Sequence, residues 1–287
     1  MVKLLYALAI ILIIGGLLFQ FAALQSFNFV IPKDANTRLL ASDVHYGADE
    51  RQVLDIYAPD KAQGALPIVV FIHGGSWSSG TKNGYEFVGR AFAAQGFLTL
   101  VANYRLHPQH PFPAFVEDAA LALDWTTRHG EEYGGDEHKI FALGHSAGAY
   151  NLALAILNKN YLAQLGTDVS AIKAVATLAG PFDFLPLDGA ITKDVFGALP
   201  NLEETQPVNY ARSDAPPFLV IHGTADTTVY PKNAVALNKA LLNAGANVTL
   251  KTYDGVSHVG IMISLAKPLR KLAPTLIDVT EFFRSRL

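Results

Sequence analysis

The sequence predicts an α/β fold in which a mainly parallel β-sheet is covered by helices on both faces. From about residue 66 onwards, short apolar runs that end in turn residues alternate with longer segments of helical periodicity. This alternation is typical of parallel sheets. The chain has 287 residues, of which 51% are hydrophobic and 16% are charged, a composition that suits one domain with a large core. We expect this domain to span residues 31–287.

The individual elements follow from periodicity and turn residues, taken in chain order. Residues 39–46 and 52–58 flank the turn Gly47-Ala-Asp-Glu50, which predicts a β-hairpin. Short apolar runs predict strands at 67–73, 97–103, 139–143 and 171–178, and two later strands that begin at 218 and 248. Apolar residues spaced three or four apart predict helices at 84–94, 112–128, from 149 onwards, at 231–243 and from about 274.

Residues 181–214 interrupt this alternation. The segment has no clear periodicity and contains Pro181, Pro186, Pro200 and Pro207. A loop of this length is usually functional or forms a lid. We expect a small cap, inserted after the sixth strand and lined by apolar side chains such as Phe182, Phe184 and Phe196. The alternative is a surface excursion with a small core of its own.

The N-terminus is the most apolar part of the chain. Leu4 to Leu24 is almost unbroken apolar sequence after Lys3, and about 20 such residues can cross a bilayer as a helix. Residues 1–30 are therefore predicted to be a hydrophobic helix that acts as a membrane anchor or a cleaved signal peptide, with a buried core helix as a third possibility. Because Lys3 precedes the span, the first two place the domain outside the cytoplasm, anchored or, after cleavage, secreted or periplasmic.

Charge and composition exclude several classes of function. The formal net charge is −3 and the basic residues are scattered, so no nucleic-acid footprint is present. The chain contains no cysteine, which excludes disulfides and lipid attachment through a thiol. His107, His110 and His145 do not form a credible metal set. We expect neither a metal nor an organic cofactor, and no sequence feature predicts an oligomeric state.

Residues Gly144 to Gly148 read Gly-His-Ser-Ala-Gly and lie between a predicted strand and an Ala/Leu-rich helix. A serine in such a sharp strand-to-helix turn is forced out of the sheet, with the helix N-terminus beneath its hydroxyl. The flanking glycines suit close backbone packing on either side. We predict that Ser146 is a catalytic nucleophile; a plain glycine-rich turn is the alternative.

A nucleophilic serine needs a base and an acid that orients the base. Two strands downstream of Ser146 end in loops that carry Asp226 and His258, in the chain order serine, acid, histidine. The carboxyl ends of parallel strands meet at one edge of a sheet, where open α/β folds place their sites. We therefore predict Asp226 as the acid and His258 as the base. Asp254 and Asp183 are weaker candidates for the acid.

The loop after the strand at 67–73 is the candidate oxyanion hole. Gly74 and Gly75 follow His73 directly and allow backbone N–H groups to turn toward an incoming carbonyl oxygen. The N–H of Ala147, the residue after the nucleophile, is the expected second donor. Trp77 ends the same loop and is a candidate for the wall of a substrate pocket, with ordinary packing as the alternative.

On these residues the chain resembles the α/β-hydrolase fold esterases, specifically the hormone-sensitive-lipase-like and bacterial carboxylesterase group. The matching stretches are His73–Trp77, Asn103–Pro113, Glu117-Asp118, Tyr133–Asp136, Gly144–Gly148, His222–Asp226 and His258. Ser76 replaces a glycine of the lipase-like pattern, and His145 replaces an acid. Little room exists between Leu24 and the strand near Leu40 for the helical cap of the lipase-like group. The Gly-His-Ser-Ala-Gly-Ala pattern and the missing cap make the chain also similar to kynurenine-formamidase-like, feruloyl-esterase-like and isoprenylcysteine-methylesterase-like enzymes.

The resemblance implies a serine hydrolase that cleaves carboxylic esters with small acyl or aryl groups through an acyl-enzyme intermediate. Small-molecule esters are the expected partners, together with a membrane through the N-terminal segment. An arylformamidase-like amidase is the alternative within the same chemistry. A non-catalytic binding module with a hydrolase fold is the alternative from another class, and it normally lacks one member of the triad.

Overall fold

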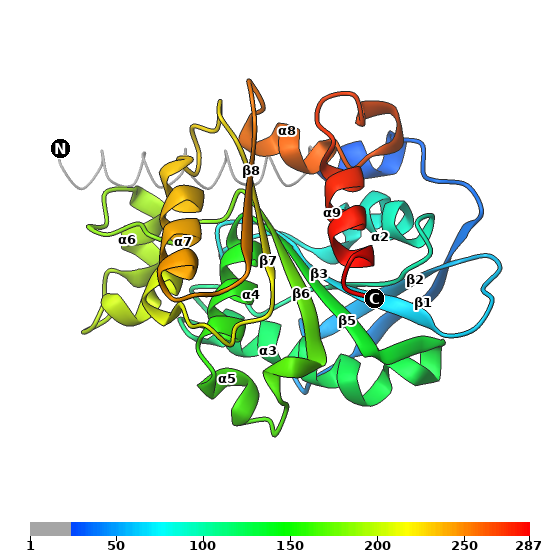
Figure 1. Cartoon of the computed structure of the whole chain (residues 1–287), viewed down its shortest axis with the longest axis horizontal. Coiled ribbons are helices and arrows are strands. Elements are labelled where there is room, and N and C mark those ends of the chain that lie inside the picture. The colour runs from blue at the N-terminus through cyan, green and yellow to red at the C-terminus, as the bar shows by residue number, and fades with distance from the viewer. Residues whose placement is uncertain (1–23) are drawn as a thin grey trace.

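The computed structural model describes residues 24–287, which build an eight-stranded sheet in the order β1-β2-β4-β3-β5-β6-β7-β8 (Figure 1). β1 and β2 form an antiparallel hairpin, and β2 also runs antiparallel to β4, whereas the remaining neighbours are parallel. The predicted hairpin and mainly parallel sheet are therefore confirmed. The strands are β1 (Thr37–His45), β2 (Val53–Pro59), β3 (Leu66–Ile72), β4 (Leu98–Ala102), β5 (Gly135–His145), β6 (Ile172–Leu178), β7 (Phe218–Gly223) and β8 (Val248–Tyr253).

Helices follow most of the parallel strands, as predicted. The α-helices are α2 (Glu86–Ala93), α3 (Ala114–His129), α4 (Ala147–Leu157), α5 (Asn160–Ala163), α6 (Ala190–Phe196), α7 (Lys232–Asn243), α8 (His258–Ile263) and α9 (Thr275–Arg284). The 3-10 helices are η1 (Lys82–Gly84), η2 (Gly130–Tyr133), η3 (Val169–Ala171), η4 (Glu203–Thr205), η5 (Pro207–Tyr210) and η6 (Lys267–Leu269).

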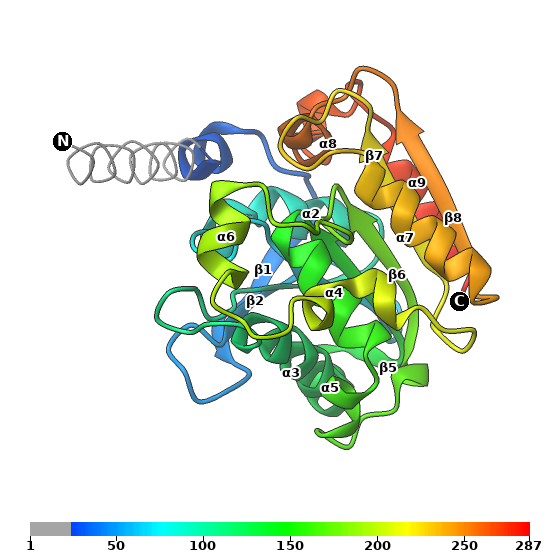
Figure 2. The same ribbon diagram turned by 90° about the vertical axis from the view of Figure 1, so that its left-hand side faces the viewer.

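Each face of the sheet has its own hydrophobic core. Successive side chains of a strand point to opposite faces, so Val70 of β3 enters one core and Phe71 enters the other. The core around Val70 is closed by α3, α4 and α7, and the core around Phe71 is closed by α2, α8 and α9. Figures 1 and 2 show these helices on either side of the sheet. The predicted cover on both faces is confirmed.

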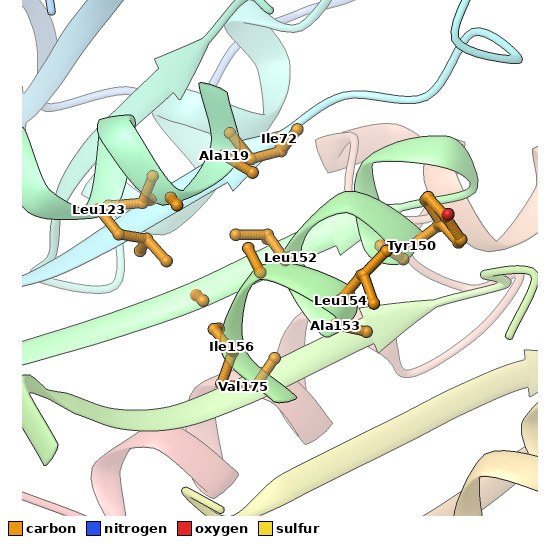
Figure 3. Close-up of a cluster of buried hydrophobic side chains, with 14 of the residues drawn as sticks. Ile72, Ala119, Leu123, Tyr150, Leu152, Ala153, Leu154, Ile156 and Val175 are labelled. Carbon is orange, nitrogen blue, oxygen red and sulfur yellow. The ribbon is translucent and has the colours of Figure 1, made fainter. Parts of the chain in front are cut away.

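Helix α4 lies deepest of all the helices, because all of its residues are buried. A helix that is apolar on every side belongs in a core. Figure 3 shows its Leu152 and Ile156 in a cluster with Leu123 of α3 and Val175 of β6. This packing holds the N-terminus of α4 in place, and Ser146 is the residue immediately before that helix.

The segment between β6 and β7 folds back onto the domain. Its helix α6 ends at Phe196, whose fully buried ring packs edge-on against Trp77 at a centroid distance of 4.9 Å. The backbone N–H groups of Phe182 and Asp183 donate to Asn233 Oδ1 at 2.8 and 2.9 Å. The aromatic rings of this segment thus join the main core, rather than forming a separate one.

Residues 24–30 are helical and lead into β1. In the part of the chain from residue 24 onwards, no helix combines the length and the apolar character that crossing a membrane requires. Apart from Leu24, the apolar stretch predicted to form an N-terminal hydrophobic helix lies outside the described residues.

Candidate active site

Ser146 occupies a strained turn between β5 and α4. Its backbone has φ 53° and ψ −123°, a region that L-residues other than glycine rarely adopt. The neighbouring glycines make this turn possible: a Cβ on Gly144 would lie 2.6 Å from the carbonyl oxygen of Gly148, and a Cβ on Gly148 would lie 2.2 Å from that of Ile72. The fully buried surroundings of α4 hold the strained residue in place.

His258 reaches Ser146 from the loop that follows the edge strand β8. It begins α8, directly after the loop that follows β8, and Ser257 caps this helix by accepting a hydrogen bond from the N–H of Gly260 at 3.1 Å. The Nε2 atom of His258 lies 2.9 Å from Ser146 Oγ. The structure therefore brings together two side chains that are 112 residues apart in the sequence, at the distance of a hydrogen bond.

Asp226 completes the chain of hydrogen bonds. Its Oδ2 lies 2.7 Å from His258 Nδ1, and its Oδ1 accepts from the backbone N–H groups of Thr228 and Val229 at 2.9 Å each. Burial by itself raises the pKa of Asp226, but donors from His222, His258 and Val229 outweigh it and lower that pKa. The ionised carboxylate fixes the proton of His258 on Nδ1. Asp254, the alternative acid, accepts from Thr224 at 3.1 Å.

His222 also contacts the carboxylate of Asp226, and sequence reasoning did not assign it a role. Its Nε2 lies 3.2 Å from Asp226 Oδ2 and 2.8 Å from the carbonyl oxygen of Val229. Because both partners are acceptors, Nε2 carries the proton. The side chain is fully buried at the end of β7. A histidine four residues before the predicted acid, at the end of a buried strand, is the sequence signal that would have pointed to it.

We predict that His222 positions Asp226. Hydrogen bonds to charged groups contribute about 1.5–3 kcal/mol, so His222→Ala should lower kcat/KM about 10- to 100-fold and move the acid limb of its pH profile to higher pH. His222→Gln, which keeps an N–H donor, should restore most of the activity. The measurement is kcat/KM between pH 4 and 9. An alanine variant with the wild-type profile would contradict the assignment.

His145, the residue before Ser146, braces the loop of His258. Its Nε2 donates to the carbonyl oxygen of His258 at 3.2 Å, and the two imidazole rings lie 4.9 Å apart. Burial lowers the pKa of His145 to about 3, and the neighbouring His258 adds to this effect. The imidazole therefore stays neutral in the working range of most enzymes.

The buried histidines predict a loss of stability in acid. Burial lowers the pKa of His73 to about 4 and that of His145 to about 3, against about 6.5 in an unfolded chain. Below pH 6.5 these two histidines bind protons in the unfolded chain but stay neutral in the folded chain. The free energy of unfolding is therefore highest above pH 6.5 and falls as the pH drops toward 4. Between pH 7 and pH 5 we expect the free energy of unfolding to fall by about 2 kcal/mol per histidine. Urea unfolding at the two pH values measures this fall.

The control for this prediction is His145→Gln, which removes one of the two titrations. Its unfolding free energy should fall by about half as much between pH 7 and pH 5 as that of the unaltered chain. An identical fall in both proteins would show that other groups set the acid sensitivity.

The predicted oxyanion loop lies directly against the nucleophile. A Cβ placed on Gly74 would lie 3.0 Å from Ser146 Cβ and 3.0 Å from His145 Nδ1, so only glycine leaves this approach open. Gly75 has φ 136°, and a Cβ there would lie 2.1 Å from the carbonyl oxygen of Ser79. Ala147 is the first residue of α4, where backbone N–H groups have no partner within the helix. The predicted N–H donors thus come from two segments that meet at Ser146.

The buried side chains of His73 and Trp77 hold the same loop in place. His73 Nδ1 donates to the carbonyl oxygen of Gly74 at 2.7 Å, and its ring stacks on Tyr104 at 4.7 Å. The Trp77 indole is 3% exposed and donates from Nε1 to Asn151 Oδ1 at 3.1 Å. Its ring belongs to the aromatic cluster with Phe196 rather than to the open surface.

A sharply turned serine before a buried helix, a histidine and an aspartate at the ends of later strands, and a mainly parallel sheet define the α/β-hydrolase fold. Comparison with known proteins agrees, because residues 54–241 match the BD-FAE family. The chain therefore belongs to the BD-FAE family, and its fold is that of the α/β hydrolases.

Two individual relatives of the chain are named as a methylesterase and an esterase. The chain is 29% identical, over 79% of its length, to a probable isoprenylcysteine alpha-carbonyl methylesterase of Oryza sativa, and 32% identical, over 65%, to esterase LipC of Mycobacterium tuberculosis. It spans 58% and 51% of the length of these two relatives. Among solved structures it is similar to esterase B of Lactobacillus rhamnosis, with a TM-score of 0.83, 21% identity and 96% of each chain covered. That likeness shows the fold.

Proposed function

We propose that this chain hydrolyses carboxylic esters of small acyl or aryl substrates, with Ser146 as nucleophile, His258 as base and Asp226 as the orienting acid. The observation that carries the proposal is the unbroken series of contacts from Ser146 Oγ to His258 Nε2 at 2.9 Å and from His258 Nδ1 to Asp226 Oδ2 at 2.7 Å. The family and its esterase relatives support the reaction class.

The geometry supports acyl transfer in two steps. His258 Nε2 takes the proton as Ser146 Oγ attacks the ester carbonyl, while ionised Asp226 stabilises the imidazolium. N–H groups of Gly74 or Gly75 and of Ala147 hold the developing oxyanion, and the loss of one oxyanion-hole donor costs about 2.7–4 kcal/mol in a serine protease of another fold. His258 then gives the proton to the leaving alcohol. Water, activated by the same histidine, releases the acid and restores the serine.

Trp77 is proposed to act on substrate binding through the oxyanion loop. Its indole is anchored by Asn151 and covered by Phe196 of α6, and its exposed fraction of 3% leaves little surface for direct contact. The same contacts join the 181–214 segment to the loop that carries Gly74 and Gly75. We propose that this segment serves as a small cap over the acyl side of the site.

The acyl preference is tested with p-nitrophenyl formate, acetate, butyrate and octanoate, together with an N-formyl anilide. We expect clear hydrolysis of both the acetate and the butyrate, because an apolar pocket that accepts the acyl chain gains about 1–3 kcal/mol for each methylene that it buries. Cleavage confined to the formyl compounds, with a sharp loss by butyrate, would contradict the esterase proposal in favour of the arylformamidase alternative.

We also propose that the N-terminal segment tethers the domain to a membrane on the side away from the cytoplasm. The support is the sequence itself, in which Lys3 precedes the apolar stretch from Leu4 to Leu24. If the segment is cleaved as a signal peptide, the domain is secreted or periplasmic.

A further inference from the structure

Residues 27–34 join the apolar N-terminal sequence to the domain and pack against the domain. Asn28 is 6% exposed, and its side chain makes two hydrogen bonds to backbone groups. Its Nδ2 donates to the carbonyl oxygen of Asn83 at 2.9 Å, and its Oδ1 accepts from the N–H of Phe87 at 3.1 Å, in the first turn of α2. One side chain thus bridges the end of η1 and the start of α2.

Contacts on both sides of Asn28 extend this docking. Phe27 packs edge-on against Phe87, with ring centroids 5.4 Å apart. Further along, Asp34 Oδ2 forms an ion pair with Arg270 Nη2 at 2.6 Å, in the segment that follows α8. Residues 27–34 are therefore tied both to α2 and to the region beyond α8. These contacts restrict the movement of residues 27–34 relative to the domain.

Two large apolar side chains on the docked stretch remain exposed. Phe29 is 87% exposed and Val30 is 72% exposed, directly after the buried Asn28. A single exposed apolar residue is ordinary on a protein surface. Two adjacent ones at such exposure, a few residues after the apolar sequence from Leu4 to Leu24, mark a surface that lacks a partner within the described chain.

This surface and the candidate active site lie at the same end of the domain. Figures 1 and 2 place helix 24–30 at the end where α8 lies, toward which the β8 arrow points. α8 begins with His258, and the next residue, Val259, is 58% exposed. The helix that carries the exposed apolar pair and the rim of the site thus lie at the same end of the molecule.

We propose that this end of the domain rests on a lipid bilayer, with Phe29 and Val30 immersed in its interfacial region. An apolar sequence long enough to cross a bilayer runs into a docked connection, so the bilayer that receives it must lie beside these two side chains. The same docking turns the end that carries His258 toward the lipid. On the ester hydrolysis proposed above, the site would then take amphiphilic esters presented from the membrane.

The absence of cysteine allows a direct test. Phe29→Cys in the full-length chain is labelled with an environment-sensitive fluorophore and reconstituted into phosphatidylcholine vesicles. The matched control is Leu242→Cys, a 55% exposed position at the end of α7, where β8 begins rather than where it ends. We expect nitroxide lipids to quench the label at 29 at least several-fold more than the label at 242.

Two outcomes would overturn the proposal. If aqueous iodide quenches both labels equally, residue 29 lies in water. If neither iodide nor nitroxide lipid reaches the label at 29, protein covers it, and a second copy of the chain is the occupant.

A second variant separates this inference from the proposed activity. Asn28→Ala removes both hydrogen bonds that dock the connection. We expect hydrolysis of soluble p-nitrophenyl acetate to stay at the level of the unaltered protein, while hydrolysis of a long-chain ester embedded in vesicles falls several-fold. Unchanged rates on both substrates would contradict the orienting role. No hydrolysis of either substrate by the unaltered protein would instead contradict the proposed function and leave the fluorescence result to decide the orientation.

Discussion

Replacing Ser146 by alanine is expected to lower kcat for p-nitrophenyl acetate by about 10⁶-fold, because loss of the nucleophile removes the acyl-enzyme pathway altogether. The variant should fold normally. Alanine keeps the Cβ that the turn at φ 53° already accommodates, and the buried helix α4 that follows is unchanged. The measurement is initial rate at saturating substrate, with circular dichroism as a check on the fold.

Ser170→Ala is the matched control for this variant. Ser170 is exposed in η3, outside the candidate active site, and its backbone N–H donates to Asp168 Oδ1 at 2.7 Å. This control should keep the full rate. Retention of more than a tenth of the activity by Ser146→Ala would mean that another group attacks the ester.

Replacing Asp226 by asparagine should lower kcat by about 10⁴-fold, as for other triads of this type. The side chain keeps its size, and its oxygen can still accept from the N–H groups of Thr228 and Val229. Its amide, however, would donate to His258 Nδ1 and force the imidazole proton onto Nε2. That tautomer cannot take the proton of Ser146. The effect should appear in kcat for p-nitrophenyl acetate at pH 7.5.

Asp254→Asn provides the comparison that separates the two candidate acids. Asp254 contacts Thr224 at the exposed end of β8, so its loss should change kcat by less than about threefold. A larger loss from Asp254→Asn than from Asp226→Asn would contradict the assignment of the acid.

Much of the fold was predictable because strands of a parallel sheet are buried on both faces and read as apolar runs. β3, β4 and β6 begin and end within one residue of their predicted positions, and β7 begins where predicted, at Phe218. β5 begins at Gly135, four residues earlier than predicted. Its polar start, residues 135–139, pairs at the end of the sheet, where Gly135 lies opposite Leu66 and side chains reach solvent. Hydrophobic periodicity does not predict a strand in such a polar segment.

The proposed nucleophile, base and acid were predictable because each stands at the end of a strand, where parallel topology gathers residues from distant sequence positions. The supporting contacts were not. His222 and His145 contact Asp226 and His258 through nitrogen atoms whose direction depends on tertiary packing. The buried position of Trp77 depends on Phe196, which lies 119 residues further along the chain in a segment without periodicity.

Ester hydrolysis at this site depends most on the activation of the Ser146 hydroxyl by His258. The most direct measurement is covalent labelling with a fluorophosphonate, followed by mass spectrometry of the proteolytic peptides. We expect one adduct per chain, on the peptide that contains Ser146, formed in step with the loss of esterase activity and greatly slowed in His258→Ala. An adduct on a different residue that tracks inactivation, or unchanged labelling of Ser146 without His258, would contradict the account.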